Sequence, residues 1–286
     1  PAQRIVVTAG ASAALQLACL ALVERGDEVL MPDPSYPCNR HFVAAADGVP
    51  VLLPASAAQR FQLDAAGVEA AWTARTAGVL LASPSNPTGT SIAPGEMGRI
   101  VQAVRARGGF TIVDEIYLAL SFDDAFGHSA LAHAVQGDVI SINSFSKYFC
   151  MTGWRLGWMV VPEVLVAPIE RLAQNLYICP SSIAQHAALA CFEPDAIAEY
   201  ERRRAEFRAR RDFLVPALDA LGLAVPVLPD GAFYAWADVS KHAASSWDFA
   251  FDMMRRAHVA ITPGRDFGRA ASERYVRLSY ASSMPQ

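Results

Sequence analysis

The segment that decides the fold is Ser144-Phe-Ser-Lys147-Tyr-Phe-Cys-Met-Thr-Gly153-Trp-Arg155-Leu-Gly157. Lys147 follows Ser144 by three residues and precedes Arg155 by eight. A lysine amine condenses with an aldehyde to form a Schiff base. A serine hydroxyl and an arginine fork are suited to hold a phosphate. The segment therefore indicates a site for an aldehyde cofactor that carries a phosphate.

Composition and charge limit the class of protein. The chain has 286 residues, of which 53% are hydrophobic and 18% are charged, as is typical of a globular chain with one large or two medium domains. The formal net charge of −4 argues against nucleic acid as the main partner. The densest basic stretch, 202–211, is interleaved with acidic residues, which predicts a solvated helix face with i,i+4 ion pairs.

The five cysteines are scattered, and none forms a CxxC pair. A reducing compartment, most simply the cytosol, is therefore the expected location. The sequence has no HExxH motif and no metal-like spacing of histidine and cysteine, so we expect no metal. The longest apolar stretch, near 17–23, is too short to cross a bilayer, and no secretory signal opens the chain, so we expect no membrane association.

Strand-like and helix-like segments alternate over the first half of the chain. The expected strands are 5–8, 28–31, 49–53, 79–82, 110–113, 139–143 and 156–161. The expected helices are 12–24, 35–46, 64–72 and 96–107. Such alternation predicts an α/β fold with a mostly parallel sheet sandwiched by helices. In these sheets the functional side chains gather at the carboxyl ends of the strands.

The pattern changes after about residue 178. Helices are expected at 183–191, 196–221 and 247–257, and strands at 225–227, 232–237, 259–261 and 275–279. This predicts a smaller α+β unit at the C-terminal end of the chain. We therefore expect a large domain over 1–180 and a small domain over 181–286.

Polar residues follow two of the expected strands. Asn86 belongs to the turn Ser83-Pro-Ser-Asn86-Pro87-Thr88-Gly89, where it is either a simple turn residue or a donor to a phenolate oxygen. Asp114 ends the next strand, where a carboxylate needs a partner. That partner is either an arginine or a protonated pyridine nitrogen, which would make the ring an electron sink. Tyr117 is either a packed core aromatic or a second donor to the same oxygen.

Three further places fit a flat ligand that carries a phosphate and a partner that carries a carboxylate. Ala11 and Ser12 begin a helix after a strand, where backbone N–H groups bind anions, although Ser12 as an ordinary N-cap is the simpler interpretation. Tyr36 follows another strand, and it either stacks on a flat ring or lines a turn. Arg277 is a single arginine in an apolar strand, which indicates a carboxylate partner from the protein or from a substrate.

Taken together, these segments resemble fold-type I pyridoxal-phosphate enzymes, and specifically class I/II aminotransferases of the aspartate-aminotransferase type. The resemblance runs in order over essentially the whole chain. Its most specific parts are the asparagine–proline loop, the Asp-x-x-Tyr strand end and the Ser-x-x-Lys…Arg segment. The Gly231-Ala-Phe-Tyr234 strand and the loop from Thr262 to Gly268 also resemble small-domain features of this family.

The resemblance implies a role for each candidate residue. Lys147 would form the internal aldimine with pyridoxal 5'-phosphate and act as the catalytic base. Asp114 would pair with the pyridine nitrogen, Asn86 and Tyr117 with the ring oxygen, and Tyr36 would stack on the ring. Ala11, Ser12, Ser144 and Arg155 would hold the phosphate. Arg277 would bind the substrate carboxylate, with Asn86 beside it.

The implied reaction moves an amino group between an L-amino acid and a 2-oxo acid by a ping-pong aldimine mechanism. The alternatives are a β-eliminating lyase on the same scaffold, a cofactor-sensing domain of a transcription regulator, and a truncated pseudo-enzyme. In enzymes of this family the sites lie at the subunit interface, so the resemblance implies a homodimer. Family members begin well before this chain does and end in further helices, so we expect the N-terminal arm and the C-terminal helices to be missing.

Overall fold

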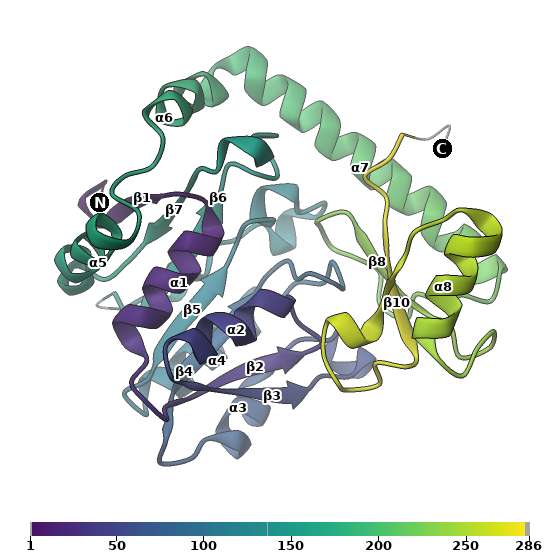
Figure 1. Ribbon diagram of the computed structural model, residues 1–286, viewed down its shortest axis with the longest axis horizontal. Helices are drawn as coiled ribbons and strands as arrows, with labels where there is room; N and C mark the ends of the chain where they lie inside the picture. Colours follow the sequence, from purple (N-terminus) through teal and green to yellow (C-terminus); the bar gives the residue numbers. More distant parts are fainter. Residues whose placement is uncertain (1, 136, 284–286) are drawn as a thin grey trace.

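The computed structural model describes residues 2–135 and 137–283, which form two β-sheets and the helices around them (Figure 1). The larger sheet contains β1 (Ile5–Thr8), β2 (Glu28–Asp33), β3 (Val49–Pro54), β4 (Thr76–Ala82), β5 (Phe110–Asp114), β6 (Val139–Ser144) and β7 (Gly157–Val160). Their order across the sheet is β1-β7-β6-β5-β4-β2-β3. Every strand predicted for the first half of the chain is therefore confirmed, within a few residues of its expected bounds.

The directions of these strands bring their functional ends together. Strands β2 to β6 pair in parallel, whereas β7 is antiparallel to both β6 and β1. The carboxyl ends of β1, β2, β4, β5 and β6 and the start of β7 consequently meet at one edge of the sheet. The predicted α/β fold with a mostly parallel sheet is confirmed.

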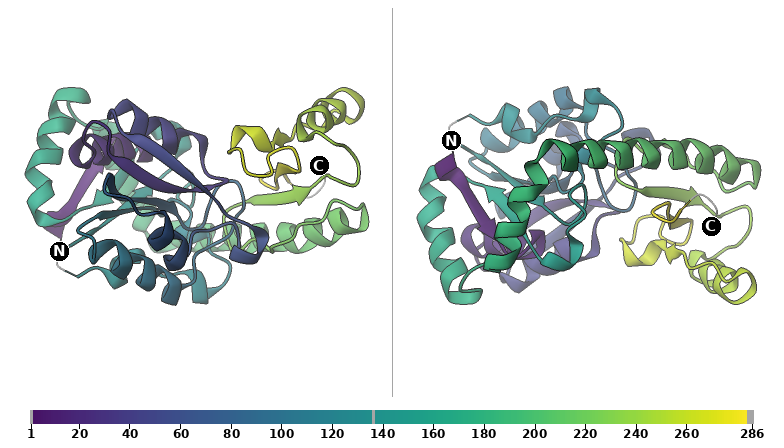
Figure 2. Two further views of the ribbon diagram at one scale, coloured as in Figure 1. Left: turned by 90° about the horizontal axis from the view of Figure 1, so that it is seen from below. Right: turned by 90° about the horizontal axis from the view of Figure 1, so that it is seen from above.

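Helices cover both faces of the larger sheet (Figure 2). One face packs against α1 (Ala11–Leu22), α2 (Pro37–Ala45) and α5 (Glu163–Leu176), and the other against α3 (Ala65–Ala71) and α4 (Pro94–Arg105). Because successive side chains of a strand point to opposite faces, Ile112 packs with α1 whereas Val113 packs with α4. Burial on both faces explains why these strands are apolar without alternation.

The second sheet is smaller and antiparallel. It contains β8 (Tyr234–Asp238), β9 (Thr262–Pro263) and β10 (Tyr275–Ser279) in the order β8-β10-β9. The helix α8 (Ser246–Ala257) packs on it, as does the C-terminal part of the long α7 (Pro194–Ala220), which follows α6 (Ser182–Leu189). The basic stretch 202–211 lies on α7 and forms the predicted i,i+4 ion pairs, among them Arg202–Glu206 and Arg203–Glu199.

Three secondary-structure predictions need correction. The segment 225–227 forms no strand. It belongs to a loop that packs on the small sheet, and its apolar pattern reflects the partial burial of Val225 and Val227 in that loop. The segment 259–261 follows the left-handed residue His258 (φ 56°) that ends α8, and the strand begins only at Thr262. The sequence also failed to predict α5, because Pro168 interrupts its helical pattern.

The division of the chain at residue 180 stays a prediction. Ala184 and Ala188 of α6 pack with Phe145 and Leu156 beside the larger sheet, although they follow that boundary in sequence. From there α7 extends to the smaller sheet, as Figures 1 and 2 show.

Two findings concern the described residues, 2–135 and 137–283, as a whole. No helix among them is both long and apolar enough to cross a bilayer, and they contain no cluster of histidine, cysteine and carboxylate side chains that fits a metal ion. All five cysteines lie in this part of the chain and are free thiols.

Replacement of Ile112 tests this assignment of the core. Ile112 is fully buried in β5, so Ile112→Ala should lower the free energy of unfolding by about 2–5 kcal/mol, because it leaves a cavity. Urea denaturation measures the loss. Val164 of α5 is 82% exposed, so the control Val164→Ala should change stability by less than about 0.5 kcal/mol. Equal losses in the two variants would contradict the assignment.

Candidate active site

A cavity of about 320 Å³ opens at the edge of the sheet where the strand ends meet. It is lined by almost all the residues that the sequence singles out, namely Ala11, Ser12, Tyr36, Asn86, Asp114, Tyr117, Lys147, Arg155 and Arg277. These residues come from six different strand ends and from the small sheet. The fold therefore brings together groups that lie up to 266 positions apart in the sequence, from Ala11 to Arg277.

Asp114 is a buried carboxylate at the end of β5. It is 4% exposed, and its Oδ1 accepts a hydrogen bond of 3.1 Å from the amide of Ile116. Burial raises the pKa of Asp114 to about 7, against the lowering effects of the Ile116 amide and of Lys147. No arginine forms an ion pair with it among residues 2–135 and 137–283. The arginine partner that the sequence left open is therefore wrong for the described part of the chain.

Lys147 projects its amine into the same cavity. Its Nζ lies 5.5 Å from the ring centroid of Tyr117 and 5.7 Å from that of Phe233. Burial lowers the pKa of Lys147, and the guanidinium groups of Arg277 and Arg155 lower it further, whereas Asp114 raises it. A lower pKa increases the fraction of neutral amine, which is the nucleophilic form.

Two glycines allow the Arg155 guanidinium to lie against the start of α1. A side-chain carbon on Gly10 would come within 2.7 Å of Arg155 Nη2, and one on Gly157 within 2.9 Å of the Ala11 nitrogen. Gly10 also has φ +88°, in the region that favours glycine. Because a helix N-terminus and a guanidinium attract the same anion, this corner is a preformed cradle for a phosphate.

The position of Ser12 follows from the same helix start. Gly10 is the N-cap of α1, and Ser12 lies in its first turn. The interpretation of Ser12 as an ordinary N-cap is therefore wrong. Its side chain instead lines the cavity next to Arg155.

Arg277 of β10 extends from the small sheet to the loop after β4. Its Nη1 donates to Asn86 Oδ1 at 3.0 Å, and its Nη2 donates to Thr262 Oγ1 at 3.2 Å. Nε is buried and has no hydrogen-bond partner within the described part of the chain. The guanidinium is thus oriented by neutral oxygens, and no carboxylate among the described residues neutralises it.

Two tyrosines form another wall of the cavity. The hydroxyls of Tyr117 and Tyr234 are 2.9 Å apart, and the Arg277 guanidinium lies 4.6 Å from the Tyr234 ring centroid. Burial raises the pKa of Tyr117 well above its usual value, so its hydroxyl remains a neutral donor at physiological pH. Tyr117 is therefore both a packed aromatic and a polar group of the cavity.

Ser144 differs from the other sequence-predicted site residues, because it does not line this cavity. Its Oγ accepts a hydrogen bond of 3.0 Å from the amide of Ser146 and lies 3.4 Å from the Leu156 carbonyl oxygen. From the same segment, Ser146 and Thr152 line the cavity instead. The direct phosphate contact of Ser144 stays a prediction.

Sequence reasoning missed Ser146, Thr152 and Tyr234 as site residues. Ser146 adjoins Lys147, and Thr152 lies within the segment quoted first, so their closeness to the lysine was an available signal. Tyr234 belongs to the Gly231-Ala-Phe-Tyr234 segment, but nothing in that pattern indicates which aromatic side chain faces the cavity.

Comparison with protein families gives one decisive match. Residues 1–286 match the model of the family "Aminotransferase class I and II". The chain belongs to the class I and II aminotransferases. Members of this family use pyridoxal phosphate and act on amino acids and 2-oxo acids.

Individual aminotransferases agree with this assignment. The valine–pyruvate aminotransferase of Mycobacterium tuberculosis is 38% identical over 97% of this chain and 71% of its own length. The aspartate aminotransferase of Pyrococcus abyssi is 31% identical over 99% of this chain and 73% of its own. These relatives support transfer of an amino group over the lyase and the regulator domain that the sequence left open.

Solved aminotransferases share the fold as well. The crystal structure of an aminotransferase from M. tuberculosis superposes with a TM-score of 0.94 at 38% identity, covering 99% of this chain and 72% of the other. The aspartate aminotransferase of Rhizobium meliloti gives a TM-score of 0.92 at 31% identity, covering 100% of this chain and 74% of the other.

The cavity of this aminotransferase fits pyridoxal phosphate. The glycine-lined cradle of Arg155 and α1 suits the phosphate, since a Cβ on Gly10 or Gly157 would close it. Asp114 suits a protonated ring nitrogen, because it is a buried acid whose pKa lies near 7. Lys147 suits the aldehyde, because its pKa is lowered. The donor set thus matches the three reactive parts of the cofactor.

Asp114 gives the cofactor-free protein a distinctive pH dependence. Its pKa of about 7 lies above the ordinary value of 3.8, so the folded state retains a proton that the unfolded state loses. Wild-type stability should fall between about pH 4 and pH 7, and Asp114→Asn should remove this loss. The variant should gain at most about 4 kcal/mol relative to wild type at pH 8 and nothing near pH 4. Urea denaturation across this range measures the difference, and a constant difference would contradict the assignment.

Proposed function

We propose that Lys147, Asp114, Asn86, Tyr117 and Arg155 bind pyridoxal phosphate in this cavity. One observation supports this most: a half-buried amine, a buried carboxylate and an arginine cradle line a single cavity. We further propose that Arg277 binds the substrate carboxylate. The remaining roles are proposed for Ala11, Ser12 and Ser144 at the phosphate and for Tyr36 on the ring.

Pyridoxal phosphate, when bound, supplies an aldehyde that condenses with amines and a ring that withdraws electrons from the adjacent carbon. Lys147 is the amine suited to this aldehyde, because burial favours its neutral form. With the substrate amine in place of Lys147 at the aldehyde, the free Nζ of Lys147 would accept the proton of the substrate α-carbon. The same Nζ would then give that proton to the former aldehyde carbon of the cofactor, so Lys147 would act first as general base and then as general acid.

Asp114 and Arg277 would hold two different molecules, the cofactor and the substrate. Asp114 would hold a proton on the ring nitrogen, because a buried carboxylate prefers a cationic or protonated partner. The fork of Arg277 matches a carboxylate, and its contacts with Asn86 and Thr262 already restrict its rotation. An amino acid bound in this way would present its amine and α-carbon to Lys147.

The lysine assignment is tested by Lys147→Ala. This variant should lose at least about 10³-fold in the rate of 2-oxo acid formation, because it removes both the nucleophile and the proton carrier. The assay uses a panel of amino donors with 2-oxoglutarate as acceptor. Borohydride reduction should attach the cofactor mass to the Lys147 peptide of wild type and leave the variant unlabelled. Turnover at the wild-type rate in Lys147→Ala would refute the proposal.

The carboxylate contact is tested by Arg277→Lys. The lysine keeps the charge but loses the fork, so KM for the amino donor should rise about 10–100-fold. Arg274→Lys is the matched control, because Arg274 lies three residues away in an exposed ion pair with Asp238. Steady-state kinetics on both variants give the comparison. An equal change in KM for the two variants would argue against a substrate contact of Arg277.

We propose a homodimer and a cytosolic location for the protein. An apolar groove of about 410 Å³ beside α6, lined by Val7, Leu189 and Phe192 among others, supports docking of a second copy. Leu189 and Phe192 are 66% and 59% exposed in the single chain, so two large apolar side chains of one groove face solvent there. The five free thiols support a reducing compartment.

A further inference from the structure

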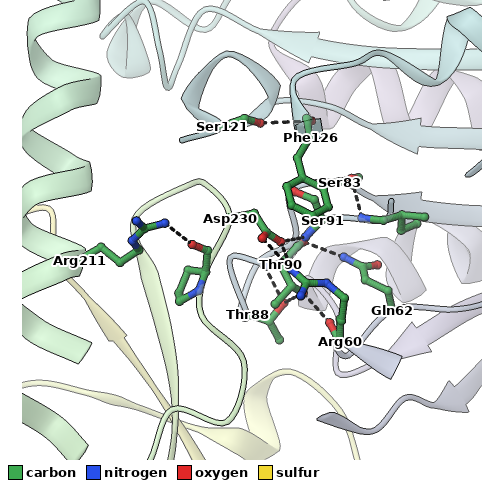
Figure 3. Close-up of polar contacts among 12 residues, drawn as sticks. Arg60, Gln62, Ser83, Thr88, Thr90, Ser91, Ser121, Phe126, Arg211 and Asp230 are labelled. Atoms are coloured by element: carbon green, nitrogen blue, oxygen red, sulfur yellow. Dashed lines mark hydrogen bonds and ion pairs between the residues drawn. The ribbon is translucent and has the colours of Figure 1, made fainter. Parts of the chain in front are cut away.

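Asp230 lies in the turn before β8, at the place where the small sheet meets the loop after β4. We call residues 229–231 the Asp230 turn and residues 83–91 the asparagine loop. The Asp230 carboxylate is buried, and Figure 3 shows how Arg60 and Ser91 converge on it. Arg60 Nη2 lies 2.6 Å from Oδ1 and 2.5 Å from Oδ2, and the Ser91 amide donates to Oδ2 at 2.7 Å.

Backbone hydrogen bonds join the Asp230 turn to the same loop. The amides of Asp230 and Gly231 both donate to the Gly89 carbonyl oxygen, at 2.8 and 3.1 Å. The Asp230 carbonyl oxygen in turn accepts from the Phe122 amide at 2.7 Å. The turn is thus fastened to two loops of the larger sheet, while its own chain continues directly into β8.

Glycines allow the two segments to come this close. Gly89 has φ +68°, and a side-chain carbon there would lie 2.7 Å from Pro229 Cβ and 3.0 Å from the Gly231 carbonyl oxygen. At Gly231, such a carbon would lie 2.9 Å from both Pro84 Cγ and the Leu120 carbonyl oxygen. The asparagine loop and the Asp230 turn therefore fit together without free space between them.

Polar contacts also make the asparagine loop stiff. The Ser85 amide donates to the Thr90 carbonyl oxygen at 2.9 Å, and the Gly89 amide donates to the Ser85 carbonyl oxygen at 2.8 Å. Thr90 Oγ1 donates to the Arg60 carbonyl oxygen at 2.7 Å, and Gln62 Nε2 donates to the Thr90 carbonyl oxygen at 2.8 Å. Asn86 lies inside this closed loop, so anchoring the loop at Gly89 and Ser91 fixes the backbone of Asn86.

We propose that Asp230, held by Arg60, is a positioning residue for substrate binding. It fixes the asparagine loop on the small sheet and so holds Asn86 where its Oδ1 orients Arg277. Asp230 does not line the cavity itself, and it acts through Asn86. The inference rests on the proposed role of Arg277 in binding the substrate carboxylate.

Loss of the carboxylate has a definite physical consequence. In Asp230→Asn the Ser91 amide and the Arg60 guanidinium lose a charged acceptor, and hydrogen bonds to charged groups are the stronger ones. The asparagine loop should then open more often. A less restricted Arg277 binds a carboxylate more weakly, because part of the binding energy is used to order it. The effect should appear in substrate affinity rather than in the proton-transfer step.

The first experiment measures amide hydrogen exchange at Ser91 in the full chain loaded with pyridoxal phosphate. Asp230→Asn should accelerate exchange at Ser91 about tenfold or more. Asp238→Asn is a matched control, because Asp238 also accepts from one arginine, Arg274, and from one backbone amide, that of Ser240. The control should leave exchange at Ser91 unchanged. Unchanged exchange in Asp230→Asn would overturn the proposal.

The second experiment separates binding from turnover. KM for the amino donor should rise about tenfold in Asp230→Asn, with kcat within about threefold of wild type. The Kd of an α-methyl amino acid, which lacks the α-proton, should rise by the same factor in calorimetry. Arg60→Met should act in the same direction, and Arg60→Lys should restore most of the affinity. A lower kcat at unchanged KM and Kd would overturn the proposal.

A double variant tests whether Arg60 acts through Asp230. If it does, Arg60→Met combined with Asp230→Asn should raise the Kd no more than Asp230→Asn alone, within about twofold. Fully additive effects would contradict this coupling. Failure of the proposed function gives a different result. If the wild type binds the α-methyl amino acid but produces no 2-oxo acid, transamination is refuted, whereas the Kd of Asp230→Asn can still be compared with that of the wild type.

Discussion

Asp114 and Lys147 influence each other's protonation across one small cavity. Burial disfavours the charge of each group, while their opposite charges favour ionisation of both. The balance leaves an acid whose pKa is about 7 and an amine whose pKa is lowered. A cavity with these two groups suits a ligand that is itself a cation at one end and an electrophile at the other. The parallel sheet makes this possible, because it ends β5 and β6 side by side.

Polar contacts hold the small sheet against this cavity at three places. Arg277 donates to Asn86, and Asp230 accepts from Arg60 and Ser91. Asp33, at the end of β2, accepts from the amides of Arg269 and Ala270. A side-chain carbon on Gly268 would lie 1.7 Å from Asp33 Oδ1, so glycine is required for this third contact. Each contact joins a strand end or loop of the larger sheet to the small sheet, so the substrate site depends on how the two sheets are joined.

Local patterns predicted most of the fold and of the cavity, because apolar strand runs and polar strand ends are visible in the sequence. Asp114 follows such a run directly, and Asn86 and Lys147 each lie four residues after the end of one. Contacts between distant segments could not be predicted in this way. Nothing near Arg60 indicates that it meets Asp230, since 170 positions separate them and the contact depends on the packing of the two sheets.

Errors in the prediction have equally local causes. Pro168 interrupts the helical pattern of α5, and Val225 and Val227 are only partly buried, in a loop that has no strand partner within the described residues. Ser146 lines the cavity, whereas Ser144 does not and instead accepts a hydrogen bond from the Ser146 amide. Which of the two serines reaches the cavity depends on the direction of the backbone after β6. Composition and spacing contain no information about that direction.

The long helix α7 is a stiff rod between the lysine segment and the small sheet. Its 27 residues span about 40 Å. Near its start, Glu201 accepts a hydrogen bond of 2.6 Å from the hydroxyl of Tyr148, the neighbour of Lys147. Near its end, Leu218 packs with Ala235 of β8. The contacts at Glu201 and Leu218 lie 17 residues apart, about 25 Å along the helix, so a tilt of α7 by about 5° would move one relative to the other by about 2 Å. A rotation of the small sheet that carries α7 with it would therefore displace Tyr148, the neighbour of Lys147.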